Sequence, residues 1–391
     1  MFIPILPNFD LPKLDVKPFN EARFRFERRD NRDFSTAVDD LRSDLLTRIR
    51  IGLSATYGPK WKGEVVYQYA HDWVFTSGKR ATDEGSDIYL ANATYQGEGY
   101  KATLGRQRLN IGTERLIGSL DWVNIPRAYD GLRVAAKDLD FFAMRVGLSV
   151  PLVPEARLLG MTKNWGKSGQ SLLVYKHDDV TAGKTDITTL SHQISYPFHG
   201  FVLDFEGALQ GGKVLGKDQE AWAWHLNAGY KLADKKTRLF VEANAASGGG
   251  NATKNRTFDN LYPTNHKFYG SMDMLAWKNM NEFAFGADHA LDKKTDLKAS
   301  WRTFSLRDPS DAWYGAGGAA NKRPGGTFVD PTGASGTKLG DEFNLEFVHR
   351  YSPTATFAGG FGVFNPGGFV KKVGGSSDRQ VWTYLQVNLK F

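Results

Sequence analysis

Apolar and polar residues alternate along this chain over unusually long stretches, and this constrains the fold more than any other feature. In residues 45–57, Ile51 and Leu53 share one face while Arg48 and Arg50 lie on the other. A period of two is typical of a β-strand with one apolar face. These stretches run for roughly 10 to 13 residues, beyond the 5 or 6 usual in soluble sheets and close to the 9 to 11 that a tilted strand needs to cross a membrane.

Aromatic residues mark the ends of such stretches. Residues 61–73 carry Trp61 and Trp73 at the two ends of one face, with Tyr67 and Tyr69 between them. Tryptophan and tyrosine gather at both interfaces of a membrane, where their amphipathic rings lie at headgroup level. A soluble β-sandwich would also alternate, but the strand length and the aromatic ends favour an all-β fold, a transmembrane antiparallel β-barrel.

Composition agrees with a barrel and excludes other classes. No run of 18 apolar residues occurs, so no transmembrane helix is predicted. Glycine is frequent at 42 residues, aromatic residues make up 13%, and a mean hydropathy of −0.42 fits strands that are only half apolar. The absence of cysteine excludes disulfides, thiolate metal sites and cysteine nucleophiles. The first residues lack the basic and apolar regions of a signal peptide, so we interpret the sequence as a mature chain.

The parity of the turns sets the predicted number of strands. Both termini of such barrels lie on the periplasmic side and the long loops lie outside. Periplasmic turns can be counted forward from the N-terminus and backward from Phe391. The two counts agree only if residues 156–164, which resemble a strand poorly on their own, also cross the membrane. The prediction is an 18-stranded barrel with strands at residues 19–29, 45–57, 61–73, 86–96, 99–108, 130–137, 140–150, 156–164, 170–177, 186–196, 200–210, 220–231, 236–246, 280–290, 294–305, 340–351, 354–364 and 379–391.

We divide the chain into an irregular, proline-rich N-terminal arm at residues 1–17 and a barrel at residues 18–391. The barrel is expected to be a monomer among outer-membrane lipids and lipopolysaccharide, with long extracellular loops and short periplasmic turns. Its alternating last strand ends at Phe391, which resembles the signal read by the barrel-assembly machinery. The side chains expected to face lipid include Ile49, Leu53, Tyr67, Phe205, Trp222, Trp224, Phe285, Trp301, Leu345 and Leu385.

A barrel of this size leaves an aqueous lumen, so its function depends on the inward face. That face is predicted to be rich in arginine, with acidic residues interleaved. About half of these residues are expected to form ion pairs that hold the loops and the barrel. The other arginines would be fixed cations for anionic groups, because guanidinium binds carboxylate bidentately. The arginines selected on the wall are Arg48, Arg50, Arg145, Arg238, Arg302 and Arg350.

The most charged segment lies at residues 105–133 and joins two strands. A loop this charged and this apolar is expected to fold into the channel, at about residues 105–131, and to narrow it. The alternation changes face near residue 105, which a bulge or the end of the strand would explain. We expect Asp130 to pair with an arginine and pin the loop. The predicted cations of the narrow zone are Arg106, Arg108, Arg115, Arg127 and Arg133, oriented by Glu114, Asp121 and Asp130.

Two stretches resemble a known family. The first holds Gly105-Arg106-Gln107, Arg115-Leu116-Ile117-Gly118 and Asp130-Gly131-Leu132-Arg133, and the second runs from Phe258-Asp259-Asn260 to Tyr269-Gly270. Both are similar to the alginate-export family of bacterial outer-membrane porins. The resemblance implies an 18-stranded monomeric barrel whose electropositive constriction passes an anionic polyuronate outward. It also implies that the second stretch belongs to a long extracellular loop.

The favoured function is passive, anion-selective passage of a polyuronate or another anionic oligosaccharide through an arginine-lined lumen. A net charge of +7 agrees with an anionic partner. The main alternative is an uptake channel for small organic anions or general solutes. An outer-membrane hydrolase, which would need a serine and an orienting partner beside His192 or His225, and a surface-binding module are weaker alternatives. No enzyme activity, cofactor, metal site or nucleic-acid partner is predicted.

Overall fold

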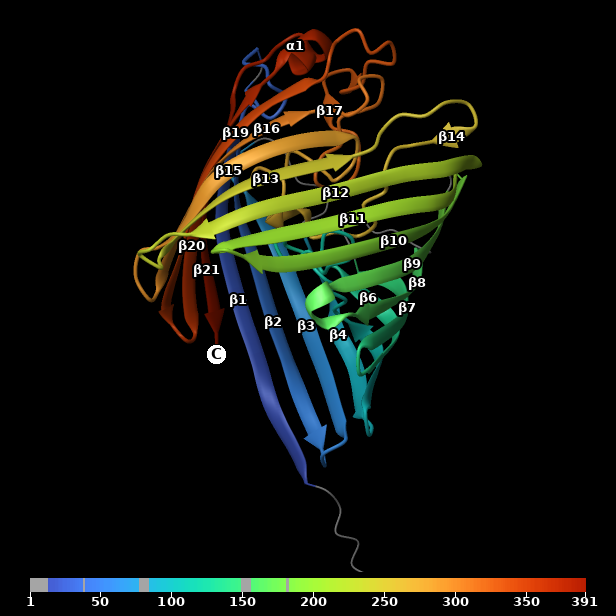
Figure 1. Cartoon of the computed structure of the whole chain (residues 1–391). Helices are drawn as coiled ribbons and strands as arrows, with labels where there is room; N and C mark the ends of the chain where they lie inside the picture. The colour runs from blue at the N-terminus through green and yellow to red at the C-terminus, as the bar shows by residue number, and fades with distance from the viewer. Residues whose placement is uncertain (1–12, 38, 77–83, 149–155, 181–182) are drawn as a thin grey trace, which may run out of the picture.

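The computed structural model describes residues 13–37, 39–76, 84–148, 156–180 and 183–391, and these form one closed antiparallel barrel (Figure 1). Each strand pairs with its neighbour in the sequence, and the last strand pairs with the first, which closes the wall. The wall consists of β1 (Leu14–Asp30), β2 (Arg42–Tyr57), β3 (Trp61–Val74), β4 (Gly85–Gln96), β5 (Tyr100–Gln107), β6 (Ala128–Ala136), β7 (Leu139–Leu148), β8 (Arg157–Asn164), β9 (Gln170–Val180), β10 (Gly183–Phe198), β11 (Phe201–Val214), β12 (Lys217–Lys231), β13 (Thr237–Ala246), β15 (Met280–Ala290), β16 (Thr295–Ser305), β19 (Lys338–Ser352), β20 (Ala355–Pro366) and β21 (Gln380–Lys390).

The shorter elements lie in the connections. They are β14 (Lys254–Asn255), which runs parallel to the start of β12, the hairpin of β17 (Lys322–Arg323) and β18 (Gly326–Thr327), the helix α1 (Gly368–Gly374) and two single 3₁₀ turns at Gly166–Ser168 and Asn265–Lys267. In Figure 1, α1 and β17 lie at the end of the barrel away from the C-terminus, which is the extracellular end. No helix in the described ranges is long and apolar enough to cross a membrane.

The structure confirms the predicted 18 strands and their order. β8, required only by turn parity, pairs with β7 and β9 along its length. The connections at the predicted periplasmic end are short, as between β2 and β3 and between β19 and β20, whereas the longest connections lie at the opposite end.

The N-terminal boundary of the barrel differs from the prediction. β1 begins at Leu14, so residues 14–17 belong to the wall rather than to the irregular arm, and residues 1–12 lie outside the described part of the chain. β21 pairs with β1 only from Glu21 onward, so the first residues of β1 pair with β2 alone. Pro18 fits there because a strand with a single neighbour does not need every N–H for a ladder.

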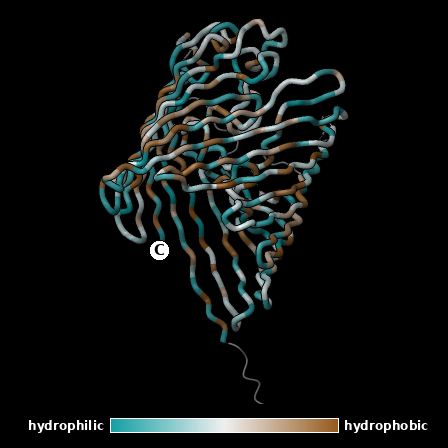
Figure 2. Tube along the Cα trace, viewed as in Figure 1, coloured by the Kyte–Doolittle hydropathy of each residue, from teal (hydrophilic) through white to brown (hydrophobic). Residues whose placement is uncertain are grey.

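Hydrophobic and hydrophilic residues alternate along the strands (Figure 2), and many large apolar side chains of the strands are exposed on the outer wall. The predicted lipid-facing residues Leu53, Tyr67, Phe205, Phe285, Leu345 and Leu385 are all exposed, and Ile49, Trp222, Trp224 and Trp301 are partly exposed. The buried apolar residues instead lie inside the barrel, where the extracellular loops pack. Trp313, for example, stacks against Phe34 and Phe364, which come from segments far apart in the sequence. The core is therefore made by loops folded into the wall.

The exposed face of β2 supports a stability prediction. Leu53 on β2 is 54% exposed and lies opposite Val65 on β3, the strand whose two ends are marked by Trp61 and Trp73. Leu53→Arg should lower the free energy of unfolding by about 2–4 kcal/mol, because it places a charge in the hydrocarbon layer. Urea unfolding in lipid vesicles measures this change. Ser54→Arg, on the lumen face beside Glu64, is the matched control, and equal losses in both variants would contradict the assignment of faces.

Candidate functional site

Two loops fold into the lumen and pair there. The first inward loop, residues 108–127, joins β5 to β6, and the second inward loop, residues 256–279, leads into β15. Their backbones bond from Gly118 N to Tyr262 O at 2.8 Å and from Tyr262 N to Leu116 O at 2.9 Å. The predicted inward fold of the first loop is thus present. The second stretch, which the resemblance placed in a long extracellular loop, lies in the long connection between β13 and β15 at that end. This connection folds inward and completes backbone hydrogen bonds of the first loop.

Glu114 joins the two loops through its side chain. Its carboxylate accepts a hydrogen bond from the Thr264 hydroxyl at 2.8 Å and pairs with Lys267 Nζ at 2.5 Å. The backbone of Glu114 is left-handed, with φ of 71°, which turns the chain at this point. Glu114 was expected to orient an arginine, and the structure shows that it holds Lys267.

Three buried arginines attach the first inward loop to the wall of β1 and β2. Arg48 and Arg50 each pair with the carboxylate of Asp121, at 3.2 Å and 2.8 Å, and both also reach Glu21. Arg23 donates to the carbonyl oxygens of residues 121–123 at 2.9 to 3.0 Å. These contacts form the wall clamp, defined here as Arg23, Arg48, Arg50 and Asp121. Arg48 and Arg50 therefore hold the loop rather than meet a solute.

The charge state of Asp121 follows from its position in the wall clamp. The residue faces a water-accessible cavity but lies deep in the barrel. Burial raises the pKa of Asp121, whereas the guanidinium groups of Arg48 and Arg50 lower it by more, so the pKa lies below the ordinary value of 3.8. The wall clamp therefore keeps its full charge well below neutral pH.

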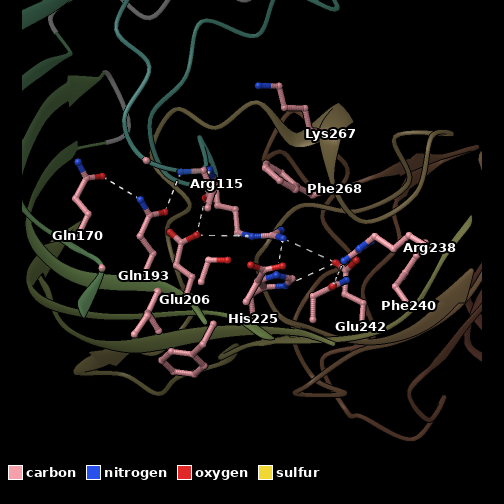
Figure 3. Close-up of a pocket in the computed structure, with 18 of the residues that line it drawn as sticks. Arg115, Gln170, Gln193, Glu206, His225, Arg238, Phe240, Glu242, Lys267 and Phe268 are labelled. Carbon is pink, nitrogen blue, oxygen red and sulfur yellow. Dashed lines mark hydrogen bonds and ion pairs between the residues drawn. The ribbon is translucent and has the colours of Figure 1, made fainter. Parts of the chain in front are cut away.

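Arg115 and Arg127 are buried within the loops. Arg127 donates to the carbonyl oxygens of Gly118 and Pro263, at 3.0 Å and 3.3 Å, and so holds the two loops together. Arg115 enters a buried network on the opposite wall (Figure 3), where it lies 3.7 Å from Glu206 and 3.9 Å from Glu242. The His225 imidazole, in neutral form, can accept from Arg115 at 3.0 Å.

The other predicted lumen arginines on the wall also have carboxylate partners. Arg302 is buried between Glu282 and Glu242, with the second contact at 3.8 Å. Three pairs lie in more exposed places, and they are Arg133 with Asp140 at 2.5 Å, Arg238 with Asp288 at 3.2 Å and Arg350 with Asp296 at 2.7 Å. Most of the arginines predicted on the lumen wall are therefore engaged in ion pairs.

Three predicted lumen residues lie on the outer wall instead. Arg106, Asp130 and Arg145 are direct cross-strand partners, and Arg106 and Arg145 pair with Asp130 at 2.7 Å and 3.2 Å. They share a face with Leu104 and Phe141, which are exposed on the outside. Asp130 therefore ties β5, β6 and β7 together and does not pin the loop. Arg108 differs, because β5 ends at Gln107 and the chain then turns inward.

Water-accessible cavities remain around the inward loops. The larger one, of about 620 Å³, borders β10 to β16 and is lined by six basic and four acidic side chains. A second cavity, of about 540 Å³, borders β1, β2 and β21 and is lined by five basic and three acidic side chains. Lys267 is 51% exposed and lines both, together with the small cavity between them. Both linings therefore carry an excess of positive charge.

Several basic residues line these cavities with exposed or partly exposed side chains, among them Lys167 and Lys390 as well as the three considered next. Arg108 lines the cavity beside β1, Lys298 lines the larger one, and neither forms an ion pair within the described ranges. Lys267 pairs with Glu114. We call Arg108, Lys267 and Lys298 the lumen cations. Of the three, Arg108 alone was predicted from the sequence, because a single lysine in a loop or on a polar face has no spacing that distinguishes it.

An aromatic stack lies between a third cavity, of about 570 Å³, and the lumen cavities described above. The third cavity borders the extracellular end of β1 and the loop at residues 313–328. The rings of Trp122 and His266 stack with centroids 3.6 Å apart, and the Arg25 guanidinium covers the other face of Trp122 at 3.9 Å. Trp122 and His266 line cavities on both sides of the stack. Because both faces of Trp122 are covered, the ring is packed between His266 and Arg25 and is not a platform for a sugar. Neither residue was predicted as a site residue from the sequence.

The surroundings of His192 and His225 bear on the alternative of an outer-membrane hydrolase. His192 Nδ1 lies 3.0 Å from Ser171 Oγ on the outer wall, and that hydroxyl also accepts from the Trp165 indole. Among the described residues, no carboxylate or amide bonds to the His192 imidazole, so the serine–histidine pair lacks an orienting partner. His225 belongs to the buried Arg115 network. No metal-binding group of histidine and acidic residues occurs in the described ranges.

Comparison with known proteins decides the family. The alginate export family model matches residues 19–155 and 163–384. The chain belongs to this family. The resemblance seen in the two sequence stretches is thereby confirmed, and the alginate-export barrel is an outer-membrane porin. No curated protein matches the sequence.

Solved structures share the fold at low sequence identity. OprD from Pseudomonas aeruginosa superposes with a TM-score of 0.64 at 11% identity, covering 98% of this chain and 96% of that one. OccK5 (OpdH) from the same organism gives 0.63 at 12% identity, covering 96% and 98%. OccK2 (OpdF), solved in complex with glucuronate, gives 0.61 at 10% identity with the same coverage. At this identity the likeness establishes the barrel fold alone.

Proposed function

We propose that this alginate-export family porin is a passive, anion-selective channel for carboxylate-bearing sugars such as oligouronates. The observation that carries the proposal is the set of lumen cations. Arg108, Lys267 and Lys298 face the water-accessible cavities while most other arginines are paired with acids. Several separated, exposed cations bind each carboxylate weakly, which conduction requires. Glucuronate, the ligand in the OccK2 complex, is a sugar of this chemical class and is consistent with the proposal.

Removing the lumen cations tests this function. The triple variant Arg108→Gln, Lys267→Gln and Lys298→Gln should lose most of its preference for anions, read as the reversal potential across a salt gradient in planar bilayers. Block of the current by added oligouronate should weaken at least about tenfold, because the variant loses three positive charges that attract carboxylates into the lumen. Higher salt should also reduce wild-type selectivity, since the Debye length falls from about 10 Å at 0.1 M to about 3 Å at 1 M.

A charge-matched control separates the lumen from the rest of the surface. Lys184→Gln, Lys293→Gln and Lys371→Gln remove three exposed charges that line none of these cavities, and selectivity should stay as in the wild type. Cation preference in the wild-type channel would contradict the proposal. Anion preference without oligouronate block would contradict the substrate class and favour small organic anions.

A further inference from the structure

The small cavity between the two lumen cavities has a wall with an ordered set of polar groups. Its volume of about 320 Å³ lies at the lower end of the range for small-molecule sites. One wall is a single cross-strand row: Lys298 on β16 is the direct partner of Glu346 on β19, Glu346 of Gly360 on β20, and Gly360 of Tyr384 on β21. We call this space the neck cavity, and the polar residues considered in it are Lys267, Lys298, Ser300, Glu346 and Tyr384.

Two hydroxyl groups on this wall are buried and have no protein partner. Ser300 is 4% exposed and Tyr384 is 5% exposed, and both residues line the neck cavity. Among the described residues, nothing forms a hydrogen bond with either hydroxyl. Most buried side-chain polar atoms in proteins have a hydrogen-bond partner. These two hydroxyls therefore have their hydrogen-bonding capacity open to a molecule that enters the cavity.

Gly360 gives the Tyr384 ring its place beside Glu346. A Cβ at Gly360 would overlap the ring and lie 3.1 Å from Glu346 Cγ, so any larger residue would push the two apart. Trp122 packs edge to face against the Tyr384 ring, with centroids 5.1 Å apart. The phenol is thus positioned by packing and not by a hydrogen bond of its own.

Glu346 is an unexpected group in a path for anions. Its carboxylate accepts a hydrogen bond from the Ser271 hydroxyl in the second inward loop, and it forms no ion pair within the described part of the chain. Lys298 and Lys267 line the same cavity. A carboxylate repels an anionic solute unless that solute also carries hydroxyl groups, whose hydrogen bonds to a carboxylate are charge-assisted. The neck cavity therefore combines cations for a carboxylate with partners for hydroxyl groups.

We propose that the neck cavity binds one sugar-acid ring and selects hydroxylated acids over other organic anions. The lysines Lys298 and Lys267 hold the carboxylate of the ring. Its hydroxyl groups donate to Glu346 and exchange hydrogen bonds with Ser300 and Tyr384. The inference rests on the proposed function and adds the source of its specificity. A site built to pair hydroxyl groups rejects an analogue without them, because its own buried polar groups would remain unpaired.

Block of the ion current by two acids of the same ring size tests this site. Glucuronate and cyclohexanecarboxylate each carry one carboxylate on a six-membered ring, but only glucuronate has hydroxyl groups. In planar bilayers, glucuronate should block the wild-type channel at least about fivefold more strongly, as expected for several hydrogen bonds to hydroxyl groups. Tyr384→Phe with Ser300→Ala removes two hydroxyls and no charge, so it should lose most of this preference. Each single change should lose part of it.

A matched control and the reversal potential separate the outcomes. Tyr89→Phe with Ser54→Ala removes the same two groups from positions that line none of these cavities, and the preference for glucuronate should remain. Heat-modifiable migration in gels confirms that each variant is folded. Equal block of the wild type by both acids overturns the inference, as does a full preference in Tyr384→Phe with Ser300→Ala.

Failure of this inference is distinguishable from failure of the transport proposal. The reversal potential depends on the lumen cations, so the variant without the two hydroxyls should keep the anion preference of the wild type. An anion-selective wild type that does not distinguish the two acids contradicts the sugar-acid site alone. A cation-selective wild type contradicts the transport proposal, and the sugar-acid site with it.

Discussion

Replacing Arg302 with methionine is expected to lower the free energy of unfolding by about 3–5 kcal/mol. Arg302 is buried on β16 between Glu282 and Glu242, and the Glu282 side chain has no exposed surface. Methionine fills a similar volume but leaves these carboxylates without their cation. The cost is that of uncompensated buried charge rather than of lost packing. Urea unfolding of the reconstituted barrel measures it.

Two further variants isolate the electrostatic origin of this loss. Arg350→Met removes an arginine from an exposed pair with Asp296 at the periplasmic rim, where the expected cost is about 0–1 kcal/mol. Adding Glu282→Gln to Arg302→Met should recover part of the stability, because the amide carries no charge to compensate. Equal losses for Arg302→Met and Arg350→Met would show that the buried network contributes nothing beyond a surface ion pair.

The fold could be predicted from the sequence because lipid imposes a simple physical pattern on each strand. Hydrocarbon outside and water inside require alternation, and the thickness of the membrane sets the length. Residues 61–73, selected on alternation and aromatic ends, correspond to β3 at Trp61–Val74. β8 shows the limit of the pattern, since its own residues are poorly alternating and only the requirement for turn parity identified it.

The faces of charged residues were less predictable near the extracellular end. Arg106 and Arg145 were predicted to face the lumen, because a charged side chain on a barrel strand was expected to point toward water inside the barrel. There the wall extends beyond the hydrocarbon layer, so charged side chains are stable on the outside as well. The sequence holds the necessary signal: Leu104 and Arg106 have the same parity, as do Phe141 and Arg145.

The inward fold of the first loop could be predicted, but its partners could not. Charge together with apolar residues indicated that residues 105–131 leave the solvent. The pairing with residues 256–279 depends on backbone hydrogen bonds between segments separated by more than a hundred positions, which leave no local pattern. For the same reason Lys267, His266 and Trp122 were not selected, because only the paired loops bring them to the centre of the lumen.

Loss of Asp121 is expected to release the first inward loop from the wall. Asp121→Ala deletes two charge-assisted contacts, to Arg48 and Arg50. Such bonds contribute about 1.5–3 kcal/mol each, so a displaced loop should become at least about tenfold more populated. We expect larger single-channel conductance and more current noise, recorded in planar bilayers. Arg23 and Arg127 still hold the loop, so the barrel should fold normally.

The pH dependence and a control variant make this prediction specific to the wall clamp. Because the pKa of Asp121 is lowered in the folded protein, its contribution is fully present above the ordinary value of 3.8 and is lost only as the pH falls further, through the lowered pKa. Wild-type noise at about pH 5 should therefore equal that at pH 7. Asp130→Ala removes a carboxylate of the same type from the outer wall, where it holds no loop, so conductance should not change. A noisy Asp130→Ala channel beside a quiet Asp121→Ala channel would return the pinning role to Asp130 and contradict the wall clamp.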